Sequence, residues 1–202
     1  MSVNRMLARK CAAVLLVLCS LSVSAFAGTS TSAKLANIRI DNFGMINQNY
    51  YRGAQPDRSD DADLSALGIK TVIDLTRDGK ADEKGLVERN GMKFYRIPLT
   101  TSDAPTQADV TEFMRLVSDP ANQPVYVHCQ GGRHRTGVMT AVYRMTQDHW
   151  NAERAYTEMK KYKFEGFPGH PALKNFVYAF YAQLDQRHLA ENERRAEAGA
   201  TK

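Results

Sequence analysis

The sequence predicts an α/β fold, in which a central, mainly parallel sheet of four to five strands is flanked by helices. Short runs rich in β-branched and aromatic residues alternate along the chain with stretches of helical period. Strands that are separated by helices pair in parallel, and the helices then cover both faces of the sheet. The 202 residues suit one domain, because a length of roughly 100 to 200 residues buries a single core.

Four runs have the composition of strands, and three of them are expected to be central. Each run is short and apolar, and turn residues or a helical pattern follow it. The predicted strands are Asn49–Ala54, Ile69–Leu75, Met92–Leu99 and Gln123–His128.

Helical patterns separate and follow these strands. Gly68 and Gly91 follow the first two helices, where a C-terminal cap favours a left-handed residue. Thr106 can cap the third helix, which is apolar on one face through Val110, Phe113, Met114 and Val117. The predicted helices are Asp60–Leu67, Asp82–Asn90, Thr106–Ser118, Val138–Trp150, Asn151–Tyr162 and Pro171 to about Arg195, the last amphipathic through Phe176, Val177, Phe180, Tyr181 and Leu184.

The N-terminus has the pattern of a secretory signal peptide. Three basic residues precede the apolar run CAAVLLVLCSLSVSAFA, which ends in the small-residue pattern Ala25-Phe26-Ala27. This run has 17 residues, fewer than the ~20 that a spanning helix needs. We expect cleavage after Ala27 and a periplasmic or secreted protein, with an uncleaved membrane anchor as the alternative. Residues 28–37 are then a flexible lead-in, 38–186 the domain, and 187–202 a frayed helix end.

Removal of residues 1–27 changes the charge and the cysteine count. It leaves 24 Lys and Arg against 22 Asp and Glu, a net charge of +2, which gives little reason to expect nucleic-acid binding. We also expect no stable membrane insertion once the signal is removed. Cys129 becomes the sole thiol, so it is either a buried packing residue or a reactive group.

The stretch VYVHCQGGRHRTG, from Val125 to Gly137, predicts a strand, a loop and the start of a helix. Ligands bind at this position in open α/β sheets. Gly131 and Gly132 allow successive backbone N–H groups to turn inward, and the helix dipole adds positive potential. Arg135 can bind two phosphate oxygens at once. Cys129 would lie at the floor as a stabilised thiolate, aligned for attack on a bound phosphoryl group.

The motif HCQGGRHRTG resembles the His-Cys-x5-Arg-Thr/Ser-Gly motif of the cysteine-dependent protein-tyrosine and dual-specificity phosphatases. Upstream, NFGMINQNYYRGAQPD, Asn42 to Asp57, resembles the start of the plant and fungal type of atypical dual-specificity phosphatase. That group includes inositol-pyrophosphate phosphatases. The resemblance covers roughly Ile38 to Leu184.

The resemblance implies a role for each residue of the loop. Cys129 attacks phosphorus to give a phosphocysteine, and Arg135 holds the equatorial oxygens. Thr136 donates its hydroxyl toward the sulfur, and His128 orients the loop through hydrogen bonds. No metal or cofactor is required. The substrate phosphate is bound by Gln130, Gly131, Gly132, Arg133, His134 and Arg135.

The mechanism also needs a general acid that protonates the leaving oxygen. Relatives commonly use an aspartate some 30 residues before the cysteine, and Asp103 lies 26 residues before Cys129. The alternative is that Asp103 only caps a turn ahead of the helix that begins near Thr106. Asp109 lies inside that helix and is a poorer candidate.

The implied function is a phosphatase acting on phosphate monoesters, of the protein-tyrosine or dual-specificity type. Arg133 and His134 resemble the inositol-pyrophosphate subgroup and would add positive charge at the pocket mouth; the alternative is that Arg133 is only a solvent-exposed charge. The partner is therefore a phosphorylated protein or peptide, or else a polyphosphorylated small molecule such as an inositol phosphate or phosphoinositide. A phosphate-binding module with little turnover is the alternative of another class.

Overall fold

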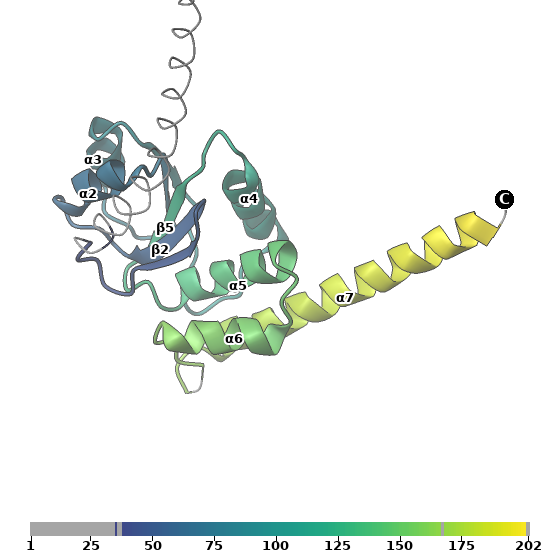
Figure 1. Cartoon of the computed structure of the whole chain (residues 1–202). Coiled ribbons are helices and arrows are strands. Elements are labelled where there is room, and N and C mark those ends of the chain that lie inside the picture. The colour runs from purple at the N-terminus through teal and green to yellow at the C-terminus, as the bar shows by residue number, and fades with distance from the viewer. Residues whose placement is uncertain (1–34, 36–37, 167, 201–202) are drawn as a thin grey trace, which may run out of the picture.

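The computed structural model describes residues 35, 38–166 and 168–200, and it folds as an α/β domain from which the C-terminal helix projects (Figure 1). The predicted signal peptide and nearly all of the predicted lead-in lie outside these residues. The elements, in chain order, are β1 (Gly44–Asn47), β2 (Tyr50–Ala54), α2 (Asp60–Leu67), β3 (Thr71–Asp74), α3 (Glu83–Arg89), β4 (Lys93–Arg96), α4 (Gln107–Ser118), β5 (Val125–Cys129), α5 (Arg135–Gln147), α6 (Ala152–Lys161) and α7 (Pro171–Ala200).

The sheet has five strands in the order β1-β2-β5-β3-β4. All neighbouring pairs are parallel except β1 with β2, so the predicted mainly parallel sheet is confirmed. The antiparallel edge strand β1 was not predicted. Its residues, GMIN, include a glycine and the exposed Met45. An edge strand is paired on one side only and needs little apolar surface, so its sequence carries a weak strand pattern.

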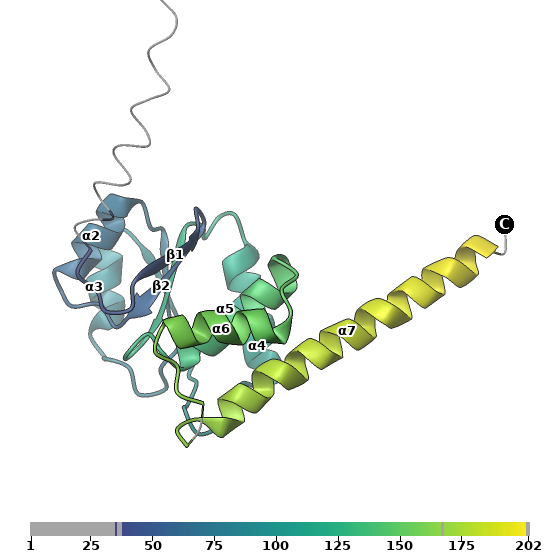
Figure 2. The ribbon, with the colours of Figure 1, turned by 60° about the horizontal axis from the view of Figure 1, so that its bottom comes forward.

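Helices cover both faces of the sheet, as predicted. Figures 1 and 2 show α2 and α3 on one face and α4, α5 and α6 on the other. The strand period of two residues explains this division, since Tyr126 of β5 packs toward α2 and α3, whereas Val125 and Val127 pack toward α5.

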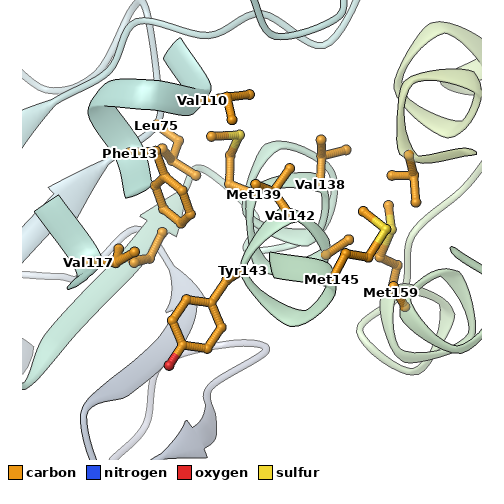
Figure 3. Close-up of a cluster of buried hydrophobic side chains, with 14 of the residues drawn as sticks. Leu75, Val110, Phe113, Val117, Val138, Met139, Val142, Tyr143, Met145 and Met159 are labelled. Atoms are coloured by element: carbon orange, nitrogen blue, oxygen red, sulfur yellow. The ribbon is translucent and has the colours of Figure 1, made fainter. Parts of the chain in front are cut away.

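The larger core is built around α5. Figure 3 shows Val138, Met139 and Val142 of this helix pointing into a cluster with Phe113 of α4 and Met159 of α6. Ten of the 13 residues of α5 are buried, which confirms the prediction of a helix that is apolar on most sides. The loop that precedes α5 is therefore anchored on a rigid element.

The ends of the helices follow local capping chemistry. Gly68 has a φ of 98° and closes α2, as predicted. Thr106 forms a capping box with Asp109 at the start of α4, which gives Asp109 a structural partner. The predicted bounds of α5 were wrong, since the helix runs from Arg135 to Gln147 and not from Val138 to Trp150. It ends early because the left-handed His149, with a φ of 54°, breaks the helical path.

Helix α7 has 30 residues and continues past the expected domain boundary at residue 186. Val177 and Phe180 are buried against the core, and Phe176, Tyr181 and Leu184 pack around them, as predicted. Beyond Asp185 the helix is exposed and projects from the body (Figure 1). Among the described helices, none combines the length and the apolar character that crossing a bilayer demands.

Candidate active site

The predicted phosphate loop joins β5 to α5 and opens into a pocket of about 520 Å³. This pocket lies at the carboxyl ends of β3, β4 and β5, where parallel α/β sheets bind ligands. Its wall comes from the loop, from the segments that follow β3 and β4, and from the start of α7. The lining residues are Arg77, Asp78, Leu99, Thr100, Thr101, Ser102, Cys129, Gln130, Gly131, Arg133, His134, Arg135 and His170.

Hydrogen bonds from behind the loop fix its backbone. Three consecutive carbonyl groups, those of residues 130–132, accept hydrogen bonds from the segment that carries β1 and β2. Because the C=O and N–H groups of successive trans peptides are held in fixed planes, these bonds set the direction of the loop amides before an anion binds. The donors are Gln55 N to Gln130 O at 3.2 Å, Asn42 Nδ2 to Gly131 O at 2.7 Å, and Arg52 Nη2 to Gly132 O.

Gly132 is required by two features of its position. Its φ is 62°, in the left-handed region that side chains disfavour. A Cβ atom there would lie 2.4 Å from the carbonyl carbon of Gly53 in β2. The loop therefore packs backbone against backbone on β2, and Gly132 shapes it in a way that a residue with a side chain could not.

Cys129 and Arg135 meet in the same pocket. Cys129 is 2% exposed and lies at the end of β5. Arg135, 8% exposed, starts α5. Its Nη1 lies 3.4 Å from Leu99 O and 3.8 Å from Asp78 Oδ1, so the guanidinium is held at the pocket wall. A phosphate bound there would exchange these weak contacts for a bidentate one.

Thr136 follows Arg135, and its role stays a prediction. Its side chain is fully buried, and Oγ1 has no hydrogen-bond partner among the described residues. A buried hydroxyl without a partner has its donor available for a nearby acceptor. The predicted donation toward the sulfur is compatible with this state.

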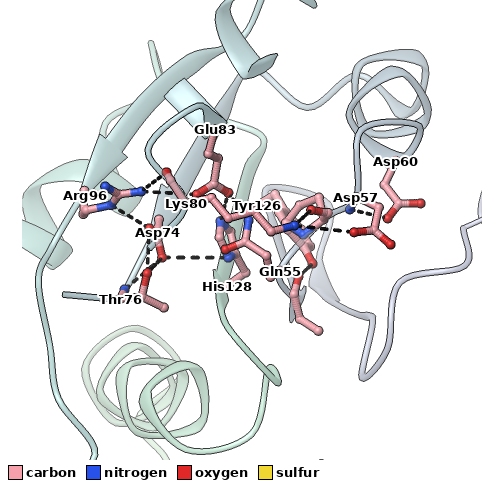
Figure 4. Close-up of polar contacts among 12 residues, drawn as sticks. Gln55, Asp57, Asp60, Asp74, Thr76, Lys80, Glu83, Arg96, Tyr126 and His128 are labelled. Carbon is pink, nitrogen blue, oxygen red and sulfur yellow. Dashed lines mark hydrogen bonds and ion pairs between the residues drawn. The ribbon is translucent and has the colours of Figure 1, made fainter. Parts of the chain in front are cut away.

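His128 lies on the opposite face of the sheet from the pocket. Its Nε2 is 2.9 Å from Glu83 Oε1, and its Nδ1 is 3.9 Å from Asp74 Oδ1 (Figure 4). Glu83 also accepts a hydrogen bond from the Gln55 side chain, and Gln55 N bonds to the loop. Glu83 and Gln55 thus form one link between His128 and the loop, and the loop-orienting role of His128 stays a prediction.

Asp74, Glu83 and His128 place potential metal-ligand atoms within 4.8 Å of one another. Arg96 already pairs with both carboxylates of this cluster, because its Nε donates to Asp74 Oδ2 at 2.7 Å and its Nη2 lies 3.4 Å from Glu83 Oε2. Burial alone would raise the pKa of Glu83, but hydrogen bonds and charge from His128, with help from Gln55 and Arg96, lower it below the ordinary value. The arrangement is an internal ion-pair network.

The charge expected from the pair Arg133 and His134 comes from Arg133. Burial is the main cause that lowers the pKa of His134 to about 4, and His170 is the second. The His134 ring is therefore neutral at pH 7. At pH 7 the positive charge of the pair is therefore that of Arg133, and the role of both residues in binding phosphate stays a prediction. The two histidine rings lie 3.9 Å apart between centroids, and His170 Nδ1 is 3.1 Å from Thr101 O.

The structure does not bring Asp103 into the pocket lining, although Thr100, Thr101 and Ser102 of the same loop line it. Hydrogen bonds from Thr100 and Ser102 hold the pKa of the exposed Asp103 carboxyl below its ordinary value. A proton-donating Asp103 would have to leave these hydroxyl groups. Its acid role stays a prediction, and Asp78 is a second carboxyl that does line the pocket.

Several residues of the site were not recognised from the sequence. Arg77 and Asp78 follow β3, and His170 precedes α7, far from the cysteine in the chain. The only available signal for the first two was their position after a predicted parallel strand, where ligand-binding loops gather. Asn42, Arg52 and Gln55 lie in the stretch that carried the upstream resemblance, but nothing in the sequence showed what they contact.

Comparisons with known proteins agree with this geometry. A family model described as "DSP-PTPase phosphatase fused to NAD+ Kinase" matches residues 36–174. A Mycosarcoma maydis protein with the provisional name tyrosine-protein phosphatase OCA1 is 31% identical over 128 residues, which cover 60% of this chain and 79% of that protein. The dual specificity protein phosphatase TpbA of Pseudomonas aeruginosa is 28% identical over 121 residues, which cover 59% of this chain and about half, 54%, of TpbA.

The solved structures show the same fold. The catalytic core of the PP-IP phosphatase Siw14 from Saccharomyces cerevisiae superposes with a TM-score of 0.62 at 22% identity, covering 76% of this chain and 94% of that one. The family model matches most of the chain, and the chain carries the HCQGGRHRTG loop on the fold of these phosphatases. These observations together define the family. The chain belongs to the dual-specificity type of the protein-tyrosine phosphatase family and is a cysteine-based phosphoric monoester hydrolase.

Proposed function

We propose that this phosphatase removes phosphate from phosphorylated side chains of proteins with dual specificity. The observation that carries the proposal is the composition of the pocket above Cys129. Its described lining has one apolar side chain, Leu99, and no Phe, Tyr or Trp. The described lining therefore has no apolar aromatic side chain to select for a phenyl ring, so phosphoserine and phosphothreonine should fit as well as phosphotyrosine. The name of TpbA, a dual specificity protein phosphatase, supports the same class.

The arrangement supports a two-step displacement without a metal. The Cys129 thiolate attacks phosphorus, the S–P bond forms, and the P–O bond to the leaving group breaks while that oxygen takes up a proton. Arg135 and the loop amides hold the three equatorial oxygens. Water then attacks phosphorus, the S–P bond breaks, and phosphate leaves with the thiolate restored. Thr136 can stabilise the departing sulfur.

A polyphosphorylated small molecule is the second candidate, and the charges of the pocket favour it. Arg77 and Arg133 line the pocket in addition to Arg135, against the single carboxylate of Asp78. One phosphoryl group bound over Cys129 would engage Arg135 and leave the two other guanidinium groups for a second phosphate. Siw14, which shares the fold, is described as a PP-IP phosphatase.

One substrate panel separates these two candidates. We expect kcat/KM for phosphotyrosine, phosphoserine and phosphothreonine peptides to agree within about tenfold and to exceed kcat/KM for inositol polyphosphates and pyrophosphates by at least tenfold, about 1.4 kcal/mol. A reversed preference would establish the second candidate. In that case Arg133→Met would reduce kcat/KM for the inositol substrate much more than for para-nitrophenyl phosphate.

We also propose that the protein is exported, on the strength of the signal-peptide pattern that ends at Ala27. Sequencing of the N-terminus of the protein recovered from cells tests this directly. A new terminus at Gly28 supports export by cleavage. An intact N-terminus on protein recovered in the membrane fraction would instead support the anchored alternative.

A further inference from the structure

Arg52 lies in the middle of the upstream stretch NYYRGAQ and occupies an unusual position for an arginine. It is 0% exposed, in the centre of β2. Its guanidinium carbon lies 3.9 Å from the centre of the Tyr162 ring, and its Nη2 donates to the carbonyl of Gly132 in the phosphate loop. Its Nε and Nη1 have no hydrogen-bond partner among the described residues.

This buried charge has no carboxylate partner at ion-pair distance in the described part of the chain. Glu158 is near enough to interact, but both of its oxygens are held by Arg144, at 3.1 and 2.8 Å. An unpaired guanidinium that is removed from water destabilises a fold by several kcal/mol. The cost of burying this charge, together with its hydrogen bond to the phosphate loop, points to a role in the site.

The groups around Arg52 show where that role lies. Burial lowers the pKa of Arg52, and the charges that favour its protonated form include that of Cys129. Arg52 also donates a hydrogen bond to the loop that begins at Cys129, so its charge lies against the floor of the phosphate loop. Strand pairing explains the proximity, since Arg52 lies opposite Val127 and Ala54 lies opposite Cys129.

We propose that Arg52 is a positioning residue for catalysis, which stabilises the Cys129 thiolate by its buried charge and fixes the phosphate loop through the Gly132 carbonyl. Arg52 is not among the residues that line the pocket, so it would act through the loop and not on the substrate. The inference rests on the proposed nucleophilic role of Cys129. It explains why an arginine stands in this stretch, 77 residues before the cysteine.

Other charges also face the loop, and the test must separate Arg52 from them. They come from the loop itself, from the segment after β3, from the start of α7, from the far face of the sheet and from the tyrosines around Arg52. These groups are Arg133, His134, Arg135, Arg77, Asp78, His170, His128, Glu83, Tyr50, Tyr126 and Tyr162, together with Glu158 of α6. All of them remain unchanged in variants at position 52.

Three substitutions separate charge from hydrogen bonding. Arg52→Lys keeps a cation and a donor, Arg52→Gln keeps a donor without charge, and Arg52→Met keeps only the length. Arg115→Met is the control for the loss of one positive charge, because Arg115 is exposed on α4 and paired with Glu112. Cooperative thermal unfolding shows that each variant is folded.

The readout is the rate at which iodoacetamide alkylates Cys129 as a function of pH, measured by peptide mapping on the full chain. We expect the midpoint of this profile to rise by about one pH unit or more in Arg52→Gln and Arg52→Met. Arg52→Lys and Arg115→Met should stay close to the unaltered protein. At pH 6, kcat/KM for para-nitrophenyl phosphate should fall at least about tenfold in the two uncharged variants, as the thiolate population falls.

The outcomes distinguish this inference from the proposed function. A folded Arg52→Gln variant with an unshifted alkylation profile would overturn the electrostatic role and leave only the hydrogen bond to Gly132. An equal shift in Arg115→Met would also overturn it, because any lost charge would then suffice. The alkylation profile needs no turnover, so inactivity of the unaltered protein on all phosphoesters would contradict the proposed function without affecting this result.

Discussion

At the scale of single residues, the site divides into groups that bind phosphate and groups that donate protons. Arg135 and the loop are arranged for the first task. The second task has two carboxyl candidates, Asp103 and Asp78. Asp103 has the expected spacing from the cysteine but points to Thr100 and Ser102. Asp78 lines the pocket, and its Oδ1 lies 3.8 Å from the Arg135 guanidinium.

The dependence of the hydrolysis rate on the leaving group identifies which carboxyl group is the general acid. We expect Asp103→Asn to slow phenyl phosphate hydrolysis at least about tenfold more than para-nitrophenyl phosphate hydrolysis, because only the poor leaving group needs a proton and general acids contribute about 10²- to 10⁴-fold. Asp78→Asn is the matched control and should affect both substrates alike. The opposite pattern would transfer the acid role to Asp78, and equal effects in both variants would exclude both residues.

A third aspartate makes a prediction about stability. Asp61 is 3% exposed on α2, and its Oδ1 has no hydrogen-bond partner among the described residues. Burial, with the charge of Glu83, raises the pKa of Asp61 to about 6. The protonated form is therefore favoured in the folded state, and its contribution to stability is present below pH 4 or so and lost as the pH rises through about 6.

Thermal unfolding of Asp61→Asn against the unaltered protein checks this. The variant should have the higher Tm at pH 7.5, where the native carboxylate is charged and buried, and the advantage should shrink at pH 4.5. Comparing the two proteins at each pH removes the contribution of all other titrating groups. The same Tm difference at both pH values would show that Asp61 does not titrate in this range.

At the scale of elements, the phosphate loop depends on β2 as much as on β5. Gly132 packs its backbone on Gly53, and three donors from residues 42–55 hold the loop carbonyls. The sequence predicted the strand, the loop and the helix around Cys129, because the glycines and the apolar pattern are local signals. It could not predict β1 or the three donors, since these depend on which strands become neighbours.

Two glycines of the loop test its contact with β2. Gly132→Ala places a methyl group against the Gly53 backbone at a positive φ, so we expect a loss of about 1–3 kcal/mol of stability and a marked fall in kcat/KM. In Gly131→Ala the added Cβ would meet only the Arg133 side chain, at 3.7 Å, an ordinary contact. Urea unfolding and steady-state kinetics of both variants compare them. Equal behaviour of the two would mean that β2 does not constrain the loop.

At the scale of the whole molecule, the sequence predicted the parallel sheet and its helices well because hydrophobic period and capping are encoded locally. Gly68 and Thr106 are examples in which one residue sets the end of a helix. The pocket wall was less predictable. Arg77, Thr101 and His170 come from three separate segments, and only the folded chain brings them within reach of one phosphate. Substrate choice depends on that wall.

The central claim is that phosphate is transferred to Cys129 before it reaches water. Rapid quenching of the enzyme during turnover of para-nitrophenyl phosphate, followed by peptide mass spectrometry, tests it most directly. We predict the mass of one phosphoryl group on Cys129, no such peptide in Cys129→Ser, and a fall of at least about 10³-fold in kcat in that variant. Chelators should change neither result. Undiminished turnover in Cys129→Ser, or turnover abolished by a chelator, would contradict the account.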